Sequence, residues 1–184
     1  AHPESLYRTP LGFLFQLGIV RNAEEVDRWN QPEAPGWITG KGYDAATDAD
    51  PSTYASVVPV NKDGPVVVHI THGMLVLNPV PGRHTQMKDL MKLPNRAHVI
   101  VNGHYHLGTG ILHFGQTVVI NPGALCRLSA HVEEMTRPVR VALLEVPEVG
   151  WPIAELIPLQ SARPGEEVLS REHLVAEAER ELRR

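Results

Sequence analysis

Short apolar segments rich in valine and isoleucine recur through the middle of the chain. Three of them carry no Asp, Glu, Lys or Arg and occupy residues 65–71, 99–101 and 117–120. Brief uncharged runs of β-branched residues are typical of buried strands. A polar or glycine-rich segment follows each run and favours a turn. The pattern therefore predicts three core strands, each ending in a turn.

Further strands are predicted around these three. Residues 37–43 are predicted as a short strand or bend. Residues 108–113 and 116–120 are expected to form a hairpin, because a Phe-Gly pair separates them. Alternating apolar residues over 138–146 predict another strand, and residues 151–158 can return as its hairpin partner.

Four helices are predicted, three of them from the helical spacing of apolar residues. The predicted helices span residues 4–17, 51–58, 86–93 and 170–183. Gly18 is expected to end the first helix, and Asp50 or Ser52 to cap the second. Residues 21–35 are polar and contain proline, so we expect a loop there or a frayed helix over residues 23–29.

Three segments follow from these patterns along the chain. Residues 1–158 are predicted to belong to one domain. Residues 159–168 are polar around Pro164 and Gly165 and read as a linker, and residues 169–184 as a charged amphipathic helix. This last helix either folds back onto its own domain or docks on a partner.

The composition narrows the class of protein. With 184 residues, 42% hydrophobic and 21% charged, the chain suits a single globular domain. The net charge of −4 and the lack of any Lys/Arg-rich block give no electrostatic signal for nucleic acid. A single cysteine excludes an internal disulfide framework, and no apolar run is long enough to span a membrane. We therefore expect a cytoplasmic protein, and its ten histidines point mildly to metal chemistry.

Histidines stand at the ends of two predicted core strands. His72 follows the first strand, and His104 and His106 follow the second after an Asn-Gly pair. Asn and Gly tolerate positive φ, so the backbone can turn sharply at residues 102–103. Residues i and i+2 of an extended or turn segment project to the same side, so both later imidazoles can face one site. Two ordinary polar loop histidines are an equally good interpretation of this spacing alone.

Other chemistry-bearing residues have more ordinary interpretations. Alternation puts His69 on the opposite side of its strand from His72, in mid-strand, where a histidine is usually a hydrogen-bonded structural residue. The aspartates of residues 44–53 lack the glycine and glutamate spacing of a calcium loop and are interpreted as a solvated loop. Arg127 is a surface arginine by default, or an anion-facing one if the preceding turn borders a site.

The ordered set of strand-His-Gly, strand-Gly-His-x-His and strand-Asn-Pro-Gly resembles the C-terminal half of the calcineurin-like metallophosphoesterases. It covers about residues 60–127. The resemblance implies an α/β fold, namely half of a four-layer α/β/β/α sandwich followed by a linker and a helix. It also implies two divalent metal ions, with Mn²⁺ expected first and zinc or iron compatible with the ligand types.

The resemblance assigns roles to particular residues. His72 and His104 would ligate one metal ion and His106 the other. Arg127 would lie near a substrate phosphate. The residues that would shape the site are Gly73, Asn102, Gly103, Asn121 and Gly123.

Three further motifs of that family have no counterpart here. They are an Asp-x-His strand end, a Gly-Asp-x-x-Asp bridge and an Asn-His-Asp/Glu segment that carries the catalytic histidine. By the resemblance, all three would lie upstream of Ala1. We therefore expect this chain to supply part of a site, with the N-terminal half of the same domain as its partner.

Three stretches look most like the SbcD-type DNA repair nucleases. They are Val-Ile-Val-Asn-Gly-His-Tyr-His at 99–106, Asn-Pro-Gly-Ala-Leu-Cys-Arg-Leu at 121–128 and Arg-Pro-Val-Arg-Val at 137–141. The resemblance implies hydrolysis of DNA phosphodiester bonds as an exo- or endonuclease, through a water activated by two metal ions. It also implies DNA and an SMC-type ATPase as partners, with a homodimer as a further option.

Other functions remain open at this stage. A small-molecule phosphodiesterase or a protein phosphatase of the same fold is the nearest alternative, and the net charge of −4 slightly favours it. A non-catalytic scaffold with a degenerate metal site, like the retromer subunit of this superfamily, would also lack half of the ligands. A mononuclear hydrolase with three histidine ligands would need a complete open site within this chain.

Overall fold

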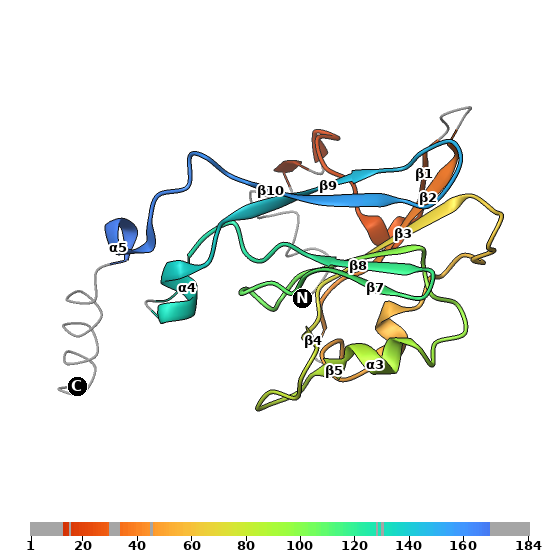
Figure 1. The fold of residues 1–184 in the computed structure, drawn as a ribbon. Coiled ribbons are helices and arrows are strands. Elements are labelled where there is room, and N and C mark those ends of the chain that lie inside the picture. The colour runs from red at the N-terminus through yellow and green to blue at the C-terminus, as the bar shows by residue number, and fades with distance from the viewer. Residues whose placement is uncertain are drawn as a thin grey trace.

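A mostly parallel sheet forms the centre of the protein in the computed structural model (Figure 1). The structure describes residues 13–14, 16–29, 34–44, 46–127, 129 and 131–169. Within these residues the fold is mixed α/β with few helices. The predicted helix at 170–183 and most of the one at 4–17 lie outside the described residues.

The central sheet has six strands in the order β1-β2-β3-β6-β8-β7. The strands span Asp27–Trp29 (β1), Gly36–Lys41 (β2), Val66–Thr71 (β3), Val99–Asn102 (β6), Gly110–Phe114 (β7) and Thr117–Asn121 (β8). β2, β3, β6 and β8 run parallel, and β1 and β7 flank them antiparallel. The carboxyl ends of the four parallel strands therefore meet at one edge of the sheet.

Both faces of the central sheet carry apolar side chains, as the uncharged valine and isoleucine runs predicted. One face packs against a cluster made by Tyr54, Val67, Leu75, Met87, Leu90, Ala97, Ile100 and Val119. The other face presents Val68, Val99, Val118 and Ile120. Parallel strands buried on both faces read as continuous hydrophobic runs, which explains the pattern of these segments.

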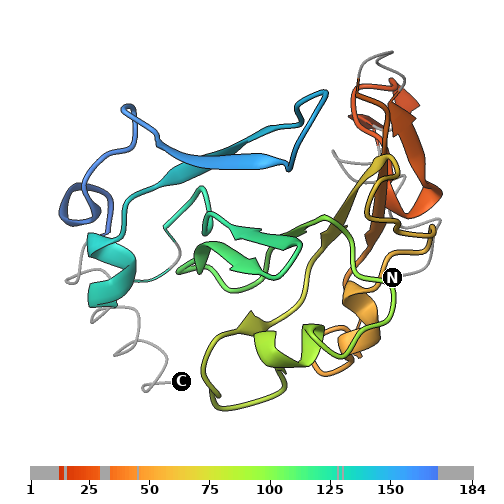
Figure 2. The ribbon, with the colours of Figure 1, turned by 45° about the vertical axis from the view of Figure 1, so that its right-hand side comes forward.

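A separate two-stranded sheet lies over the second face (Figures 1 and 2). It is the predicted hairpin of β9 (Arg140–Glu145) and β10 (Ile153–Pro158). Ala142, Leu144 and Ala154 of this hairpin pack on the core of the central sheet. Leu143 and Ile153 point the other way and are 54% and 60% exposed.

The remaining elements are short. They are η1 (Ala23–Glu25), η2 (Pro51–Tyr54), β4 (Leu75–Val76), β5 (Thr85–Gln86), α3 (Met87–Leu90), α4 (Val132–Thr136) and α5 (Gly165–Val168). Asp50 caps η2 through the amide of Ser52, as predicted. Gly18 has φ +68°, which agrees with its predicted place at the end of a helix.

Three sequence-based expectations were wrong in detail. Residues 23–29 form η1 and β1 in place of a loop or frayed helix, because β1 pairs with β2 and the indole of Trp29 donates to the carbonyl of Ala34. The helix predicted at 86–93 is α3 alone. The amides of Lys92 and Leu93 donate three residues back, to Asp89 and Leu90, as in a turn, and Pro94 disfavours a helical conformation at the residue before it. The helix predicted at 51–58 is only the short 3-10 helix η2, which ends at Tyr54.

None of the helices within the described ranges is both long and apolar enough to cross a membrane.

Candidate functional site

A hollow of about 550 Å³ opens where the parallel strands end. Its walls come from residues 22–24, 41–42, 70–72, 101–106 and 121–124. All three predicted histidines belong to these segments. Ligands of open α/β sheets commonly bind beyond the carboxyl ends of the strands, so this hollow is the candidate site.

His72 and His104 lie side by side in this hollow. Thr71 at the end of β3 pairs with Asn102 at the end of β6, so the histidines that follow both strands are brought together. Their rings are stacked, with centroids 5.1 Å apart and planes 27° from parallel. Burial lowers the pKa of His72, and protonation of His104 or His106 would lower it further. The neutral imidazole, the form that can bind a metal ion, is therefore favoured at His72.

Gly103 makes room for this pair of rings. A Cβ atom at position 103 would lie 2.8 Å from Nδ1 of His72, which is closer than a side-chain carbon can approach. The amide of Gly103 also donates to the carbonyl of Thr71, at 3.0 Å. Gly73 is similarly confined, because a Cβ there would lie 2.4 Å from the hydroxyl oxygen of Tyr54. Close packing therefore leaves no room for a side chain at either glycine, and Gly103 lines the hollow.

The sharp turn of the backbone occurs at His104, one residue later than expected. His104 has φ +73°, whereas Asn102 and Gly103 do not have positive φ. Asn102 instead continues the ladder of β6, and its side-chain oxygen accepts from the amide of Gly73 at 3.3 Å. A left-handed conformation costs a residue with a side chain on the order of 1–2 kcal/mol. The surrounding contacts must hold His104 in this conformation.

Asp48 is a site residue that the sequence analysis missed. Its Oδ1 atom lies 3.1 Å from Nδ1 of His104 and accepts from the amide of Met74 at 2.7 Å. The hydroxyl of Tyr43 donates to Oδ2 at 3.4 Å. The ring of Tyr43 also meets those of His72 and His104 edge-on, at 5.8 and 5.3 Å. A carboxylate and a phenol thus accompany the histidines.

The sequence predicts a solvated loop around Asp48 because the aspartates of residues 44–53 lack the glycine and glutamate spacing of a calcium loop. A local signal of order was present, however, in the Asp-x-x-Thr spacing of residues 44–47. Oδ1 of Asp44 accepts from the amides of Ala46 and Thr47, at 2.8 and 3.1 Å. This spacing is typical of a turn stabilised by an aspartate side chain. It predicts an ordered turn but not the approach of Asp48 to His104.

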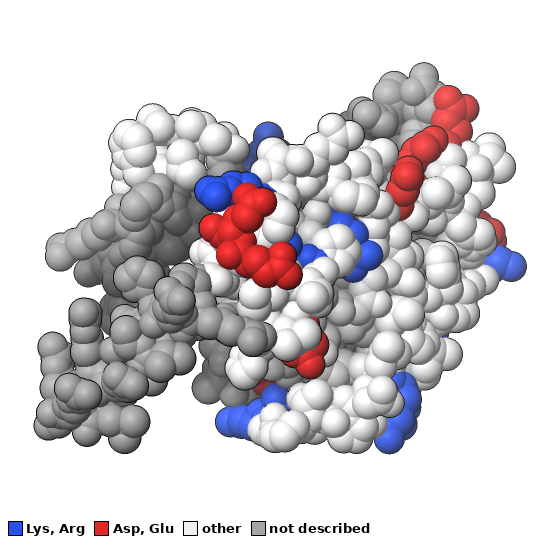
Figure 3. All heavy atoms as spheres, turned by 60° about the vertical axis from the view of Figure 1, so that its left-hand side comes forward, with Lys and Arg blue, Asp and Glu red and all other residues white. Residues whose placement is uncertain are grey.

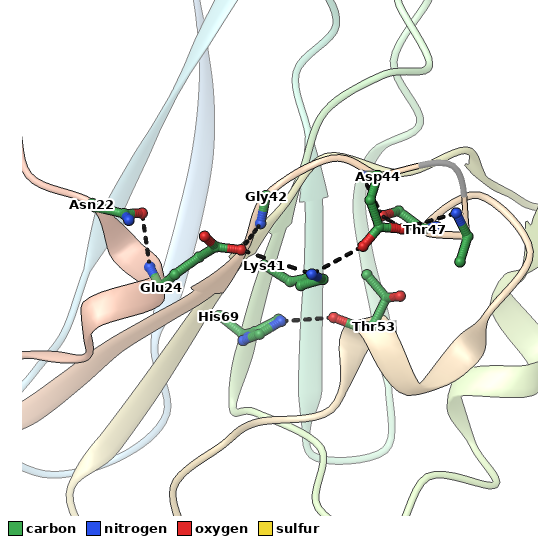
Figure 4. Close-up of polar contacts among 9 residues, drawn as sticks. Asn22, Glu24, Lys41, Gly42, Asp44, Thr47, Thr53 and His69 are labelled. Atoms are coloured by element: carbon green, nitrogen blue, oxygen red, sulfur yellow. Dashed lines mark hydrogen bonds and ion pairs between the residues drawn. The ribbon is translucent and has the colours of Figure 1, made fainter. Parts of the chain in front are cut away.

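Lys41 lines the hollow. Its ammonium group lies between the carboxylates of Glu24 and Asp44 (Figure 4). Its Nζ atom lies 3.0 Å from Asp44 and 3.9 Å from Glu24. The hydrogen bond from Lys41, together with those from Ala46 and Thr47, lowers the pKa of Asp44 to about 2. Glu24 also accepts from the amide of Gly42, at 2.7 Å. These contacts tie η1 and the turn at residue 44 to the end of β2.

His106 is exposed and belongs to the loop that the Asn-Pro-Gly turn supports. The carbonyl of His106 accepts from the amide of Ala124 at 2.9 Å. The side chain of Asn121 donates to the carbonyl of Tyr105 and accepts from the amide of Gly123. Gly123 has φ +87°, and a Cβ there would lie 2.8 Å from the carbonyl oxygen of His106. Asn121 and Gly123 therefore position the backbone next to His106.

Arg127 does not line the hollow. One nitrogen of its guanidinium donates to the backbone carbonyls of Glu134 and Arg137. Arg137 in turn forms an ion pair with Glu134 at 3.1 Å, and both side chains are only 6% exposed. These bonds fasten α4 to the segment that follows the Asn-Pro-Gly turn.

His69 is a satisfied core histidine, as its mid-strand position predicted (Figure 4). It is 1% exposed, and its Nε2 lies 2.9 Å from the carbonyl of Thr53. A carbonyl only accepts, so Nε2 carries the hydrogen and Nδ1 accepts from the hydroxyl of Thr39 at 2.8 Å. Burial lowers the pKa of His69, because a charged imidazole loses its hydration there.

The donor atoms fit a divalent metal ion in part. His72 and His104 offer imidazole nitrogens within one hollow. Among the residues that the structure describes, no three His, Cys, Asp or Glu side chains form a group that could hold a metal ion. The described residues thus bring two imidazoles together without a complete ligand set for a metal ion.

Comparison with known proteins found no similarity that could identify the chain. The sequence matches no family model and no curated protein, and the structure matches no solved structure.

Proposed function

We propose that this chain contributes part of the active site of a metal-dependent phosphoesterase of the calcineurin-like type, which hydrolyses phosphodiester bonds. One observation carries the proposal. His72 and His104, at the ends of adjacent parallel strands, stack in the hollow that His106 and the Asn-Pro-Gly turn also line. The order of these elements along the chain is the one that the resemblance implies.

Each residue has a defined role in this proposal. His72 and His104 provide nitrogen ligands for one divalent ion, and His106 for a second. Asn121 and Gly123 hold the backbone of the loop that carries His106. When bound, two such ions, with Mn²⁺ preferred, would polarise the phosphoryl oxygens and activate the attacking water.

We further propose that an N-terminal half completes both the ligand set and a four-layer sandwich. One feature supports this. The outer face of the β9–β10 hairpin exposes Leu143, Ile153 and Ile157. Apolar side chains exposed together on one face suit a missing layer.

The substrate of the proposed enzyme is DNA, with an SMC-type ATPase as a partner of the segment at 169–184. This part rests on the sequence resemblance to SbcD-type nucleases. The charge distribution does not support DNA binding. On the face in Figure 3, acidic and basic side chains lie in small groups, and the described residues there form no continuous basic band. A small phosphodiester is therefore the nearest alternative substrate.

A non-catalytic scaffold is the second candidate function. The observation that favours it is the lack of a three-ligand group among the residues described. Native mass spectrometry of the intact protein, alone and with manganese, separates the two candidates. Two bound divalent ions support the enzyme, whereas a metal-free protein of about 20 kDa, the mass of this chain, supports the scaffold.

Hydrolysis assays test the assignment of the ligands. The intact protein is given manganese with either double-stranded DNA or bis(4-nitrophenyl) phosphate. His104→Ala and His106→Ala are expected to abolish turnover of whichever substrate is cleaved. His113→Ala is the matched control, because His113 is exposed on β7 outside the hollow. Unchanged turnover in both site variants contradicts the assignment.

A further inference from the structure

We propose that Asp48 is a positioning residue that holds the imidazole of His104 in the tautomer with hydrogen on Nδ1, so that Nε2 keeps its lone pair. The contact between the two side chains carries this inference. Oδ1 of Asp48 lies 3.1 Å from Nδ1 of His104, and the side chains are only 13% and 26% exposed. That this lone pair binds a metal ion rests on the proposed function. The preference for the tautomer with hydrogen on Nδ1 does not rest on it.

Nδ1 of His104 needs Asp48 as a partner. This nitrogen is buried, and no hydrogen bond of good angular geometry satisfies it. The carboxylate of Asp48 lies within ion-pair distance all the same. An ionised carboxylate only accepts hydrogen bonds, so a favourable contact requires hydrogen on Nδ1. In the opposite tautomer, the lone pair of Nδ1 would face a negative oxygen.

The carboxylate is held in place from several directions. The amide of Met74 donates to Oδ1 at 2.7 Å, and the hydroxyl of Tyr43 donates to Oδ2 at 3.4 Å. The hydroxyl of Thr85 donates to the backbone carbonyl of Asp48 at 3.1 Å. Asp48 is therefore fixed by the start of β5 and by the residue before β4, independently of His104.

His104 also needs an external constraint on its backbone. Its φ of +73° is unfavourable for a residue with a side chain. The stacked ring of His72 and the edge of Tyr43 bound the imidazole on two sides, and Asp48 bounds it at Nδ1. A carboxylate that accepts from the second nitrogen of a metal-binding histidine orients the ring and raises its basicity.

The tautomer can be measured directly in the 184-residue chain. Two-dimensional ¹⁵N NMR of the ring nitrogens, at a pH where His104 is neutral, distinguishes a protonated from an unprotonated Nδ1. We expect a protonated Nδ1 in the wild type. Asp48→Asn retains an oxygen that can accept from the Met74 amide but loses the charge, and Asp48→Ala loses both. We expect the population with hydrogen on Nδ1 to fall in Asp48→Asn and to fall further in Asp48→Ala.

Asp50→Asn is the matched control. Asp50 lies two residues away, and asparagine preserves its capping of η2, so the tautomer of His104 should not change. The ring signals of buried His69 report whether each variant keeps its fold. An unprotonated Nδ1 in the wild type, or an unchanged tautomer in a folded Asp48→Ala variant, would overturn the inference.

Manganese titration separates this inference from the proposed function. If both hold, Asp48→Asn weakens manganese binding to the intact protein, which carries the complete ligand set, by about 10- to 100-fold, the usual effect of losing such a carboxylate. If the intact wild-type protein binds no manganese but the tautomer shifts as expected in the 184-residue chain, the positioning role of Asp48 is supported and the result counts against the metal site.

Discussion

His69 and His72 lie three residues apart and have opposite environments. Side chains alternate between the faces of a strand, so His69 points into the core while His72, just past the strand end, reaches the hollow. The ring of His69 uses both nitrogens in hydrogen bonds to Thr39 and Thr53. The position of each histidine along the chain therefore determines whether its side chain stabilises the core or lines the hollow.

The burial of His69 predicts that stability falls in mild acid. Its folded-state pKa lies below 6.5, so below about pH 6.5 the unfolded chain binds a proton that the folded chain does not. The free energy of unfolding should therefore decrease from pH 7.5 to 5.5 and level off below the folded-state pKa. Urea unfolding should show a smaller decrease in His69→Gln, while His113→Gln should behave like the wild type. An equal decrease in His69→Gln and wild type would contradict this origin.

The left-handed backbone of His104 gives a prediction about stability alone. Glycine adopts φ +73° without strain, whereas alanine does not. His104→Gly should therefore be more stable than His104→Ala by about 1 kcal/mol, although both lack the imidazole. Urea unfolding of the two variants measures this difference. A more stable His104→Ala would show that residue 104 does not keep this conformation.

At the scale of elements, the sequence predicted the parts of the fold that have a local pattern. β3, β6 and β8 were predicted because their valine and isoleucine runs match strands buried on both faces. β1 was not, because its three residues become a strand only by pairing with β2. Asp48 was missed for the same reason, since its approach to His104 depends on how distant segments pack. The Gly-His-x-His spacing, in contrast, correctly placed both histidines in one hollow.

The close approach of the Asn-Pro-Gly turn to the loop at His106 can be tested at Gly123. Gly123→Ala places a methyl group 2.8 Å from the carbonyl oxygen of His106, in addition to the strain of positive φ. Gly115→Ala is the matched control, because Gly115 also has positive φ (+60°) but no atom within 4 Å of the added carbon. We expect urea unfolding to show a greater loss of stability in Gly123→Ala, by about 1 kcal/mol or more.

The NMR signals of the imidazoles locate this effect. His106 should change in Gly123→Ala and remain unchanged in Gly115→Ala, while buried His69 should change in neither. Equal losses of stability in the two variants would mean that backbone strain alone matters and that the contact with His106 does not.

At the scale of the whole molecule, the two sheets differ in how many of their faces are covered. The six-stranded sheet is covered on both faces, whereas the β9–β10 hairpin covers one of those faces and leaves its own outer face open. A two-stranded sheet is only marginally stable by itself. The hairpin therefore depends on its packing through Ala142, Leu144 and Ala154, and its outer face is available for another layer.

The outer face of the hairpin gives a test of the proposed second half. Leu143 lies opposite Glu155 and is 54% exposed, so Leu143→Lys creates a favourable cross-strand pair in the 184-residue chain. Urea unfolding of this chain should change by no more than about 0.5 kcal/mol. In an intact protein with the proposed N-terminal half, the same lysine would be buried and should lower the unfolding temperature. Val149→Lys is the control, because Val149 is 90% exposed between the two strands. Equal unfolding temperatures for the two intact variants would mean that no layer covers this face.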